Sequence, residues 1–375
     1  MIINNAKVYR NGHFESASIE FDSHIRSFSP GEGLDACGAY IIPGLIDVHT
    51  HGAMGIDASD CTAEQIHHLA QFYSDNGVTS FCFTTLTVPA DELRGAMKNI
   101  RAYERFGGEA KCAGVHLEGP FVSRGKCGAQ NPDNIRKPDI ALFNELNELS
   151  GGIVRLITVA PEVEGALKFI REASKVCTVS LGHSTADYDQ AMAGFEAGAT
   201  HVTHLFNGME PFHHRKPGLA GAALTAGANV ELICDGVHIH PAMIMAVHKM
   251  FGDRLIIVSD SLRCAGLCDG RYNLGGLPMI VRDGRATLLD GTIAGSSSNL
   301  LQELRNVVSY GVPLEAAVKA MTETPAKDIG VFDSIGSLET GKCADFLVLN
   351  KELKLMATFI DGELVNGTTD FESVK

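Results

Sequence analysis

The sequence predicts a (β/α)8 TIM barrel over residues 47–335, joined to a small β-sandwich domain formed by residues 1–46 plus 336–375. Three observations support this prediction. Eight short apolar runs alternate with segments of helical composition, six of these runs end in acids or histidines, and both ends of the chain lie outside the repeat. The length of 375 residues and the 45% of hydrophobic residues suit a globular chain with a sizeable core.

The two terminal segments are predicted to form β-strands. The segment "MIINNAKVYRNGHFESASIEFDSHIRSFSPGEG" alternates polar and apolar residues between turn signals, which is typical of half-buried strands. The segment "GSLETGKCADFLVLNKELKLMATFIDGELVNG" near the other end has the same pattern. Neither fits a βα repeat, so we expect them to assemble into one small domain beside the barrel.

The central part of the chain contains the predicted barrel strands. They cover residues 41–48, 78–87, 112–117, 153–160, 176–182, 200–206, 230–234 and 254–259. Helical composition separates most of them, as in "CTAEQIHHLAQFYSDNG" after the first strand. This alternation is typical of a parallel sheet with crossover helices. Segments such as "SSSNLLQELRNVVSYG" are expected to close the barrel.

Charge and composition exclude several classes of function. The formal net charge of −14 argues against binding to nucleic acids or membrane surfaces, because both require a basic face, so a small molecule is the expected partner. No window offers the roughly eighteen apolar residues of a membrane span, and the N-terminus lacks a signal-peptide pattern. The ten cysteines include no C-x-x-C pair. We therefore expect a cytoplasmic protein.

Acids and histidines follow the predicted strands where the apolar runs end. They are His49 and His51 on the first strand, Glu118 on the third, His183 on the fifth, His204 on the sixth, Asp235 and His238 on the seventh, and Asp260 on the eighth. Taken singly, each could be a solvated or core-satisfied polar residue. Barrel active sites lie at the carboxyl ends of the strands, so the set together predicts a metal-binding, catalytic site.

Two further histidines lie within the same strands. His116 precedes Glu118 by two residues, so it shares the face of that residue and is expected behind the metal ligands. His201 precedes His204 by three residues, points to the opposite side and is not expected to be a ligand. Its role stays open at this point.

The motifs give the chain a family resemblance. The stretches "PGLIDVHTHG", "HLEGPF", "LGHS", "THLFNGM", "DGVHIHP" and "VSD" resemble the amidohydrolase superfamily, whose members are metal-dependent hydrolases with a TIM barrel. Within it, the chain resembles the N-acetylglucosamine-6-phosphate deacetylase family over almost its whole length. The most specific stretches are "HLEGPF", the passage from "THLFNGM" to "HHRKPGLAGAAL", and "AGSSSNL", whereas "GKCADFLVL" indicates only the superfamily.

The resemblance implies a divalent metal centre with one or two ions per subunit. It makes Glu118, His183 and His204 the ligands of one ion, and His49 and His51 would help to hold a second. Other amidohydrolases bridge two metals with a modified lysine at the fourth strand. Here that strand ends "TVAP", so Glu118 would have to bridge. Zn²⁺ is the first expectation, with Fe²⁺, Mn²⁺ and Co²⁺ as alternatives that suit the same ligands.

The implied reaction is hydrolysis of the acetamide of N-acetyl-D-glucosamine 6-phosphate to D-glucosamine 6-phosphate and acetate. A bound divalent ion acidifies water, so that hydroxide becomes available to attack the amide carbonyl. Asp260 is expected to take the proton and pass it to the departing nitrogen, because an amine cannot leave unprotonated. The alternative for Asp260 is a structural acid that caps the next turn.

The resemblance also assigns the substrate contacts. They are Ala129, Gln130, Asn207, Gly208, Arg215, Asp235, His238, Ile293, Ala294 and Gly295. Arg215 and His238 are the cationic candidates for the phosphate, since a guanidinium can bind it in bidentate fashion. In the family this arginine comes from the neighbouring subunit, which implies a homodimer. The alternative is that "HHRKPG" is only a solvated basic loop.

Two positions depart from the family pattern. Gln130 stands where a histidine is expected, and its amide can donate but cannot titrate. The stretch "SLRCAGL" after Asp260 places Leu262 and Arg263 near the expected site. Either change could favour another substrate, such as N-acetylgalactosamine 6-phosphate. The further alternatives are a cyclic-amide or nucleobase hydrolase of the same superfamily and a non-catalytic metal-binding scaffold.

Overall fold

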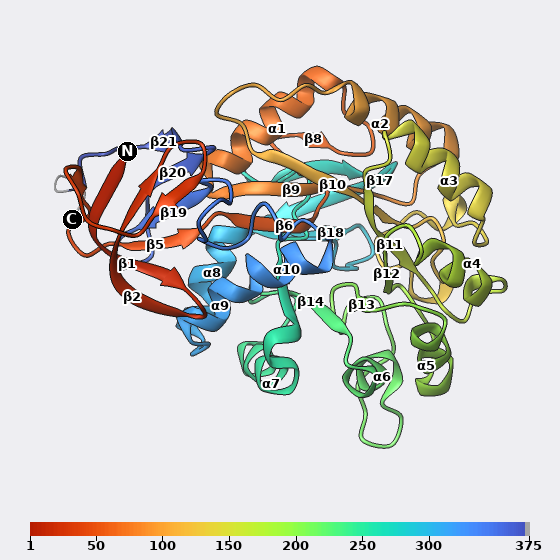
Figure 1. The fold of residues 1–375 in the computed structure, drawn as a ribbon. Coiled ribbons are helices and arrows are strands. Elements are labelled where there is room, and N and C mark those ends of the chain that lie inside the picture. Colours follow the sequence, from red (N-terminus) through yellow and green to blue (C-terminus); the bar gives the residue numbers. More distant parts are fainter. Residues whose placement is uncertain (372–375) are drawn as a thin grey trace.

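The computed structural model describes residues 1–371 and consists of a barrel with a smaller β domain at its side (Figure 1). The barrel sheet has eight strands, and each pairs in parallel with the next one along the chain. In spatial order they are β6 (Leu45–Thr50), β9 (Val78–Thr85), β10 (Lys111–Glu118), β11 (Val154–Val159), β12 (Thr178–Leu181), β13 (His201–Val202), β14 (Asn229–Ile233) and β15 (Leu255–Val258). The predicted (β/α)8 barrel is confirmed.

Backbone hydrogen bonds beyond the strand ends close the barrel between β15 and β6. The amide of Asp260 donates to the carbonyl of His49 at 2.9 Å, and the amide of His51 donates to the carbonyl of Ser261 at 2.8 Å. These bonds hold the segment after the last strand against the His-x-His segment of the first. The closure therefore places the candidate proton carrier beside two candidate metal ligands.

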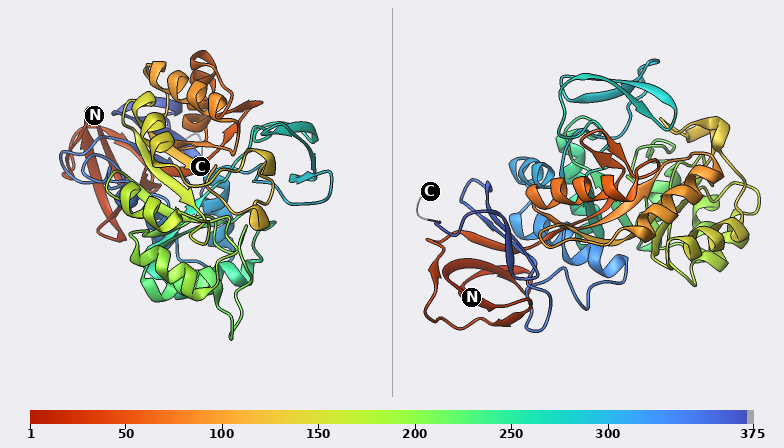
Figure 2. Two further views of the ribbon diagram at one scale, coloured as in Figure 1. Left: turned by 90° about the vertical axis from the view of Figure 1, so that its right-hand side faces the viewer. Right: turned by 90° about the horizontal axis from the view of Figure 1, so that it is seen from above.

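Helices cover the outside of the barrel sheet (Figures 1 and 2). They are α1 (Ala63–Asp75), α2 (Ala90–Ala102), α3 (Ile140–Leu149), α4 (Ala166–Ala173), α5 (Tyr188–Glu196), α6 (Gly218–Ala226), α7 (Pro241–Phe251), α8 (Leu300–Ser309), α9 (Leu314–Ala320) and α10 (Glu323–Asp328), with short 3-10 turns at Arg124–Lys126, Pro132–Asn134 and Gly252–Arg254. In α1, Thr62 and Gln65 form a capping box that satisfies the first free amides. Among the described residues, none of the helices has both the length and the apolar composition that a membrane crossing requires.

The two ends of the chain share the second sheet. Its order is β21 (Glu363–Gly367), β20 (Leu355–Ile360), β19 (Phe346–Leu349), β5 (Tyr40–Pro43), β1 (Ile2–Arg10), β2 (His13–Phe21) and β3 (Ile25–Ser27), with β4 (Leu34–Asp35) paired to β1. The sheet curls over its own core, because Phe21 of β2 meets Phe346 and Phe359 from the far side at ring distances of 4.9 and 5.5 Å. Both termini therefore build one small β domain, as predicted; its last four predicted residues, 372–375, lie outside the described part.

The first predicted barrel strand, residues 41–48, was wrong as a single element. Tyr40–Pro43 forms β5 of the terminal sheet, and the barrel strand β6 begins at Leu45. Gly44 separates them, and a Cβ atom there would lie 2.0 Å from the hydroxyl oxygen of Thr79. Because the chain must pass this close to β9, it changes sheets at a residue without a side chain. The first of the two links between the β domain and the barrel is thus one glycine long, and the second runs from α10 to β19.

A three-stranded sheet between β15 and α8 was not predicted. It consists of β16 (Gly270–Leu274), β17 (Leu277–Arg282) and β18 (Arg285–Leu288), all antiparallel. It projects from the barrel in teal, as Figure 2 shows. The turns "LGGL" and "RDGR" are hairpin signals that could have revealed it. A smaller hairpin, β7 (Gly52–Ala53) and β8 (Ile56–Asp57), follows β6.

Candidate metal centre and active site

The polar residues that follow the barrel strands meet at one cavity of about 190 Å³. Most predicted site residues line it: His51, Glu118, Ala129, Gln130, His183, His204, Asn207, Gly208, His238, Asp260, Ile293, Ala294 and Gly295. His49 is fully buried against them. Asp235 contacts His238 from behind the cavity wall, whereas Arg215 lies on an exposed loop away from it.

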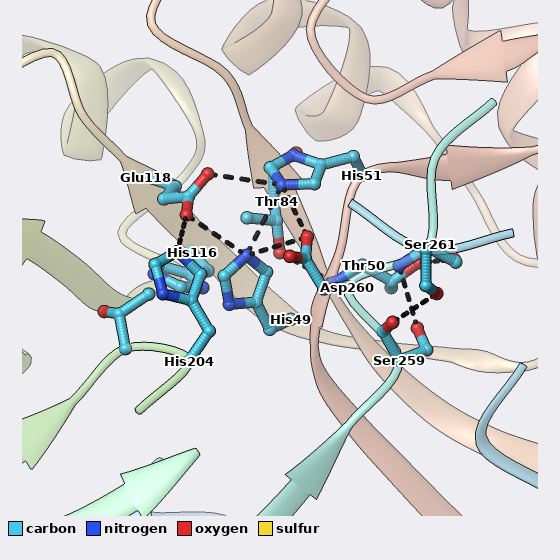
Figure 3. Close-up of polar contacts among 12 residues, drawn as sticks. His49, Thr50, His51, Thr84, His116, Glu118, His204, Ser259, Asp260 and Ser261 are labelled. Carbon is cyan, nitrogen blue, oxygen red and sulfur yellow. Dashed lines mark hydrogen bonds and ion pairs between the residues drawn. The ribbon is translucent and has the colours of Figure 1, made fainter. Parts of the chain in front are cut away.

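Glu118, the last residue of β10, is the centre of the arrangement. Its Oε1 lies 3.1 Å from Nε2 of His183 and 2.9 Å from Nε2 of His204. Its Oε2 lies 3.2 Å from Nε2 of His51 (Figure 3). Oε1 also lies 3.5 Å from Nε2 of His49. The two oxygens of this one carboxylate therefore face histidines from both groups, so the carboxylate is placed where it could bridge two ions.

A second pair of imidazoles lies beside the first. Nε2 of His49 and Nε2 of His51 are 3.4 Å apart, and Oδ1 of Asp260 lies 3.5 and 3.2 Å from them (Figure 3). The His-x-His spacing on β6 sends both rings to the same side, as the two-residue period of a strand requires. Asp260 reaches the pair through the barrel closure described above. This carboxylate thus faces the two rings and the cavity together.

Three of the four rings are oriented by a bond at the other nitrogen. Nδ1 of His49 lies 2.8 Å from a carboxylate oxygen of Glu231, Nδ1 of His51 lies 3.1 Å from the carbonyl of Thr84, and Nδ1 of His183 lies 2.9 Å from the carbonyl of Lys126. Oxygen acceptors require the proton on Nδ1. The lone pair of each Nε2 therefore points to the centre, as in histidines that bind metals.

The donor set fits a divalent ion. Nε2 of His183 and Nε2 of His204 face each other at 3.1 Å, close enough for both nitrogens to bind one cation. Three groups of ligand atoms among the described residues are close enough to hold an ion, and two of them contain Glu118: one with His183 and His204, the other with His49 and His51. The third group consists of His49, His116 and Glu231. Imidazole and carboxylate donors suit zinc and its neighbours in the first transition row.

Burial and neighbouring charges set the protonation of the two central acids. Burial acts to raise the pKa of Glu118, but the imidazoles of His49 and His183 hold it well below its usual range. Burial likewise acts to raise the pKa of Asp260, and His49 with His51 lowers it. Both carboxylates are consequently ionised at neutral pH. Asp260 is thus ready to accept a proton.

Three residues of the centre have a left-handed backbone. The φ angles are 46° for His183, 28° for His204 and 46° for Asp260. Non-glycine residues rarely adopt this region, and each such residue costs about 1–3 kcal/mol unless its surroundings hold it there. Each lies two residues after the end of a barrel strand. The turn of the backbone aims their side chains across the mouth of the barrel instead of along it.

Gln130 is bound at both ends of its amide. Its Nε2 donates to Oε2 of Glu118 at 2.5 Å, and its Oε1 accepts from the amide of Thr87 at 2.6 Å. The residue that departs from the family pattern therefore contacts the central carboxylate directly. Since glutamine does not titrate, this contact keeps the same hydrogen-bonding character across the pH range.

The two residues after Ser261 separate in space. Leu262 lines the cavity with an apolar face, as expected of a residue near the site. Arg263 does not line it, because its guanidinium turns away to Asp60 at 2.7 Å and Asp57 at 3.5 Å. The expectation that Arg263 places a charge near the substrate was therefore wrong. Only Leu262 is in a position to shape the cavity.

Within the described part of the chain, the far side of the cavity lacks a cationic side chain with free donors. Among residues 1–371, neither lysine nor arginine lines it. His238 uses both ring nitrogens, Nδ1 at 2.8 Å from Asp235 and Nε2 at 2.7 Å from the carbonyl of Ala294. Arg215 stands on the exposed loop between β13 and α6, which projects beside α6 (Figure 1). A bound phosphate would need a charge from elsewhere.

Sequence reasoning missed two kinds of site residue. Leu86, Leu274 and Thr292 line the cavity, and no polar pattern distinguishes them in the sequence. Glu231 lies inside the apolar strand β14 and is fully buried. A charged residue in the middle of such a strand was the signal that could have revealed it, since burying a charge is costly without partners.

The two histidines behind the ligands have different environments. Nε2 of His116 shares a hydrogen bond of 2.8 Å with the hydroxyl of Thr158, and burial lowers the pKa of His116 to about 3. His201 is turned away from the cavity, and its Nδ1 lies 2.7 Å from Asp328. Although burial acts to lower it, the carboxylates of Asp328 and Glu231 raise the pKa of His201 to about 10. His116 is thus neutral and His201 charged at neutral pH.

Comparisons with known proteins converge on one family. The model of the amidohydrolase family matches residues 40–365. The N-acetylglucosamine-6-phosphate deacetylase of Bacillus subtilis (strain 168) is 36% identical over 332 residues, which cover 86% of this chain and 84% of that protein. The N-acetylgalactosamine-6-phosphate deacetylase of Escherichia coli O157:H7 is 36% identical over 330 residues, covering 87% of this chain and 88% of that protein.

A solved structure agrees with these relatives over nearly the whole chain. It is that of a mutant N-acetyl-D-glucosamine-6-phosphate deacetylase from Mycobacterium smegmatis in complex with N-acetyl-D-glucosamine-6-phosphate. The TM-score is 0.92 at 31% sequence identity, and the match covers 98% of this chain and 99% of that one. The terminal β domain and the barrel are therefore found together in both proteins.

Proposed function

Because the chain belongs to the amidohydrolase family, we propose that it is a metal-dependent deacetylase that converts N-acetyl-D-glucosamine 6-phosphate to D-glucosamine 6-phosphate and acetate. The observation that supports this most is the carboxylate of Glu118, which lies among all four imidazoles, with Asp260 facing His49 and His51. Two relatives that are 36% and 35% identical to this chain are N-acetylglucosamine-6-phosphate deacetylases. The reaction is thus a hydrolysis of a linear amide bond.

The side chains divide the catalytic work. A divalent ion held by Glu118, His183 and His204 would supply a Lewis acid and acidify water beside the amide carbonyl. Asp260 is ionised and faces the cavity, so its carboxylate can accept a proton from the attacking water. The same carboxyl group then donates that proton to the nitrogen as the C–N bond breaks. Protonation is required because an amide anion is too basic to leave.

We propose that a second ion lies between His49 and His51, with Glu118 shared by both sites. The separate orientation of the two carboxylate oxygens supports this number of ions. Zn²⁺ is our first expectation, and Fe²⁺, Mn²⁺ and Co²⁺ fit the same donors. Asp260 then stands against the second site, where a nearby cation would keep it ionised before it accepts the proton.

The substrate is proposed to lie against the loops that line the cavity. Ala129, Asn207 and Gly208 form one wall, and the segment of residues 293–295 forms another. The carboxylate of Asp235 orients His238: one oxygen binds Nδ1 of the ring, and the other accepts from the backbone amide of His238. These groups would position the sugar hydroxyls. Gln130 would hold Glu118 in place beside the acetamide.

We propose a homodimer in which Arg215 of the partner subunit binds the phosphate. Two observations support it: residues 1–371 contribute no lysine or arginine to the cavity wall, and Arg215 is exposed on a loop that projects from the barrel (Figure 1). A guanidinium is the side chain best suited to bind a phosphate through two hydrogen bonds. The strongly acidic chain makes such a local cation necessary.

We also propose the cytoplasm as the compartment. All ten cysteine thiols are free, and they lie in apolar strands and loops, not in disulfide pairs. Free thiols in this number are typical of a reducing compartment.

The second candidate substrate is N-acetylgalactosamine 6-phosphate. The similarity to the E. coli enzyme and the apolar side chain of Leu262 in the cavity wall favour testing it. A cyclic-amide or nucleobase hydrolase has less support, because the fourth barrel strand ends in Thr158 and Val159, with no lysine. A non-catalytic scaffold has less support as well, because it would have no use for Asp260 beside two complete ligand sets.

Acetate release from the purified, metal-loaded protein tests the proposal. The three substrates to compare are N-acetylglucosamine 6-phosphate, its galactosamine epimer and unphosphorylated N-acetylglucosamine. We expect rapid release from the first and a large loss without the phosphate. Preference for the epimer would replace the substrate but keep the reaction. Release from none of the three would overturn the deacetylase assignment.

A further inference from the structure

A buried series of acids and histidines leads from the metal ligands to the opposite end of the barrel. Asp328 ends α10 and lies below the starts of three strands. Its carboxylate accepts from the side-chain amide of Asn229 at 2.7 Å, and its carbonyl accepts from the hydroxyl of Thr178 at 2.7 Å. Its second carboxylate oxygen binds Nδ1 of His201 at 2.7 Å. Asp328 thus fixes His201 from below.

His201 in turn contacts Glu231. Nε2 of His201 lies 3.1 Å from Oε1 of Glu231, and both side chains are fully buried. Both ring nitrogens of His201 therefore lie near carboxylate oxygens. Nδ1 forms a hydrogen bond with Asp328, and the contact of Nε2 with Glu231 is an ion pair when the ring is protonated. This arrangement offsets the cost of burying two acids inside the barrel.

The other oxygen of Glu231 contacts both ligand sets. Oε2 accepts from Nδ1 of His49 at 2.8 Å and from the backbone amide of His204 at 3.0 Å. The two contacts differ in kind. The bond to His49 fixes the tautomer and the ring of that ligand, and a carboxylate at this place makes its Nε2 a stronger donor. The bond to His204 touches only the backbone, and the ring of His204 is free of Glu231.

We propose that Glu231, held by His201 and Asp328, is a positioning residue that determines the affinity of the His49–His51 metal site. The site of Glu118, His183 and His204 depends less on Glu231, because neither of its two rings and neither oxygen of Glu118 binds that residue. The inference rests on the proposed two-ion centre but not on the identity of the substrate. It gives a function to the acid that interrupts the apolar strand β14.

The variant Glu231→Gln tests this, because it keeps the shape of the side chain and removes its charge. Zn²⁺ and Co²⁺ dissociation constants would be measured by competition with a chelator on the full chain. We expect one of the two sites to weaken by about 10- to 100-fold while the other changes little. The matched control is Glu303→Gln: Glu303 is also fully buried, and among the described residues no hydrogen bond or ion pair joins its carboxylate to a metal ligand. It should keep both affinities.

A second variant and a spectroscopic signal protect the test against a folding defect. Asp328→Asn acts two contacts away from Glu231, through His201, so it should weaken the same site by a smaller factor. In the Co²⁺-loaded wild type, the Nδ1 protons of His49, His51 and His183 should give shifted, exchangeable proton resonances. Glu231→Gln should move or remove the one from His49. If Glu231→Gln cannot be produced in folded form, the metal affinities of Asp328→Asn and its His49 resonance test the inference instead.

Two results would overturn the inference. One is wild-type affinity at both sites in Glu231→Gln, or in Asp328→Asn where only that variant folds. The other is a wild-type protein that binds one ion per subunit at saturation, since there would then be no second site to position. Failure of the deacetylase assay leaves these measurements intact, because they follow metal binding without any substrate.

Discussion

Single residues of the metal centre combine strain with burial. His183, His204 and Asp260 have left-handed backbones, although none is a glycine. Contacts from other elements hold them there, such as the bond from the amide of His204 to Glu231 and the bond from the amide of Asp260 to the carbonyl of His49. Strained backbone that persists in this way is typical of functional sites. The sequence identified these residues by type and position but could not reveal their conformation.

The first prediction at this scale concerns Asp260. Asp260→Asn keeps the size of the side chain but cannot accept a proton, so we expect kcat to fall by about 10²- to 10⁴-fold. The metal content measured by plasma mass spectrometry should stay at the wild-type level, because Glu118 and the four imidazoles are unchanged. A parallel loss of metal and activity would show that Asp260 acts as a ligand and not as the proton carrier.

The second prediction concerns pH and His201. Asp328 and Glu231 raise its pKa to about 10 in the folded state, against an ordinary value of 6.5. The folded state therefore binds more protons between these values, and the stabilisation is complete below pH 6.5 and lost as pH rises through about 10. His201→Gln should be less stable than the wild type, and this gap between the two free energies of unfolding should narrow from pH 6.5 to 10.

Urea unfolding of both proteins in the presence of a chelator would measure this gap. The chelator removes the contribution of bound ions, which also depends on pH. A gap that stays constant across the interval would contradict a charged His201 in the folded protein. A gap that widens would mean that the neutral ring is the stabilising form.

Whole elements were predictable where their pattern repeats. All eight barrel strands were found, the first with its start too early, because each is an apolar run bounded by turn signals. Six of them are also followed by an acid or histidine. The sheet of β16, β17 and β18 was missed, because it interrupts the βα repeat instead of following it. Because this sheet was missed, Leu274 at the end of β16 was not expected in the cavity wall. Apolar wall residues have no chemical signature of their own.

A prediction at the scale of the strands concerns Gly182, which follows β12 and precedes His183. A Cβ atom there would lie 2.7 Å from Cβ of Thr203 and 3.0 Å from Cγ2 of Thr158, both in neighbouring strand segments. Gly182→Ala should therefore reduce the free energy of unfolding by about 1–3 kcal/mol, since the barrel interior is closely packed. The midpoint of urea unfolding measures it.

The matched control for this change is Gly95→Ala. Gly95 lies inside α2, and a Cβ atom there meets nothing within 4 Å. Alanine is the better helix former, so this variant should gain up to about 1 kcal/mol. Equal effects of the two substitutions would contradict the steric argument for Gly182.

The whole molecule is the scale at which sequence reasoning relied most on resemblance. The order of the barrel strands follows from the βα repeat, but neither composition nor spacing indicates that an arginine reaches a neighbouring subunit. The cavity gives a physical reason for that proposal, because its wall contains no lysine or arginine from residues 1–371. The assignment of Arg215 remains a prediction until the assembly is tested.

Mixing two inactive variants tests the assembly. Arg215→Ala retains Asp260 but lacks the phosphate cation, and Asp260→Asn retains Arg215 but lacks the proton carrier. If the arginine crosses between subunits, a mixed dimer contains one intact site, and random reassociation should restore about a quarter of wild-type activity. Before mixing, the Arg215→Ala variant by itself should show a raised KM for the phosphorylated substrate. No recovery on mixing would place the arginine in its own subunit or outside the site.

The pairing of β5 with β19 has a consequence for synthesis of the protein. Ile41 pairs with Val348, so the strand that ends the N-terminal segment finds its neighbour only after the entire barrel has been translated. Such distant pairings close slowly. On the ribosome, β5 must wait with one edge unpaired while the barrel emerges, and an open edge is a site where nascent chains associate wrongly. Chaperone demand should therefore peak just before residues 346–349 leave the exit tunnel.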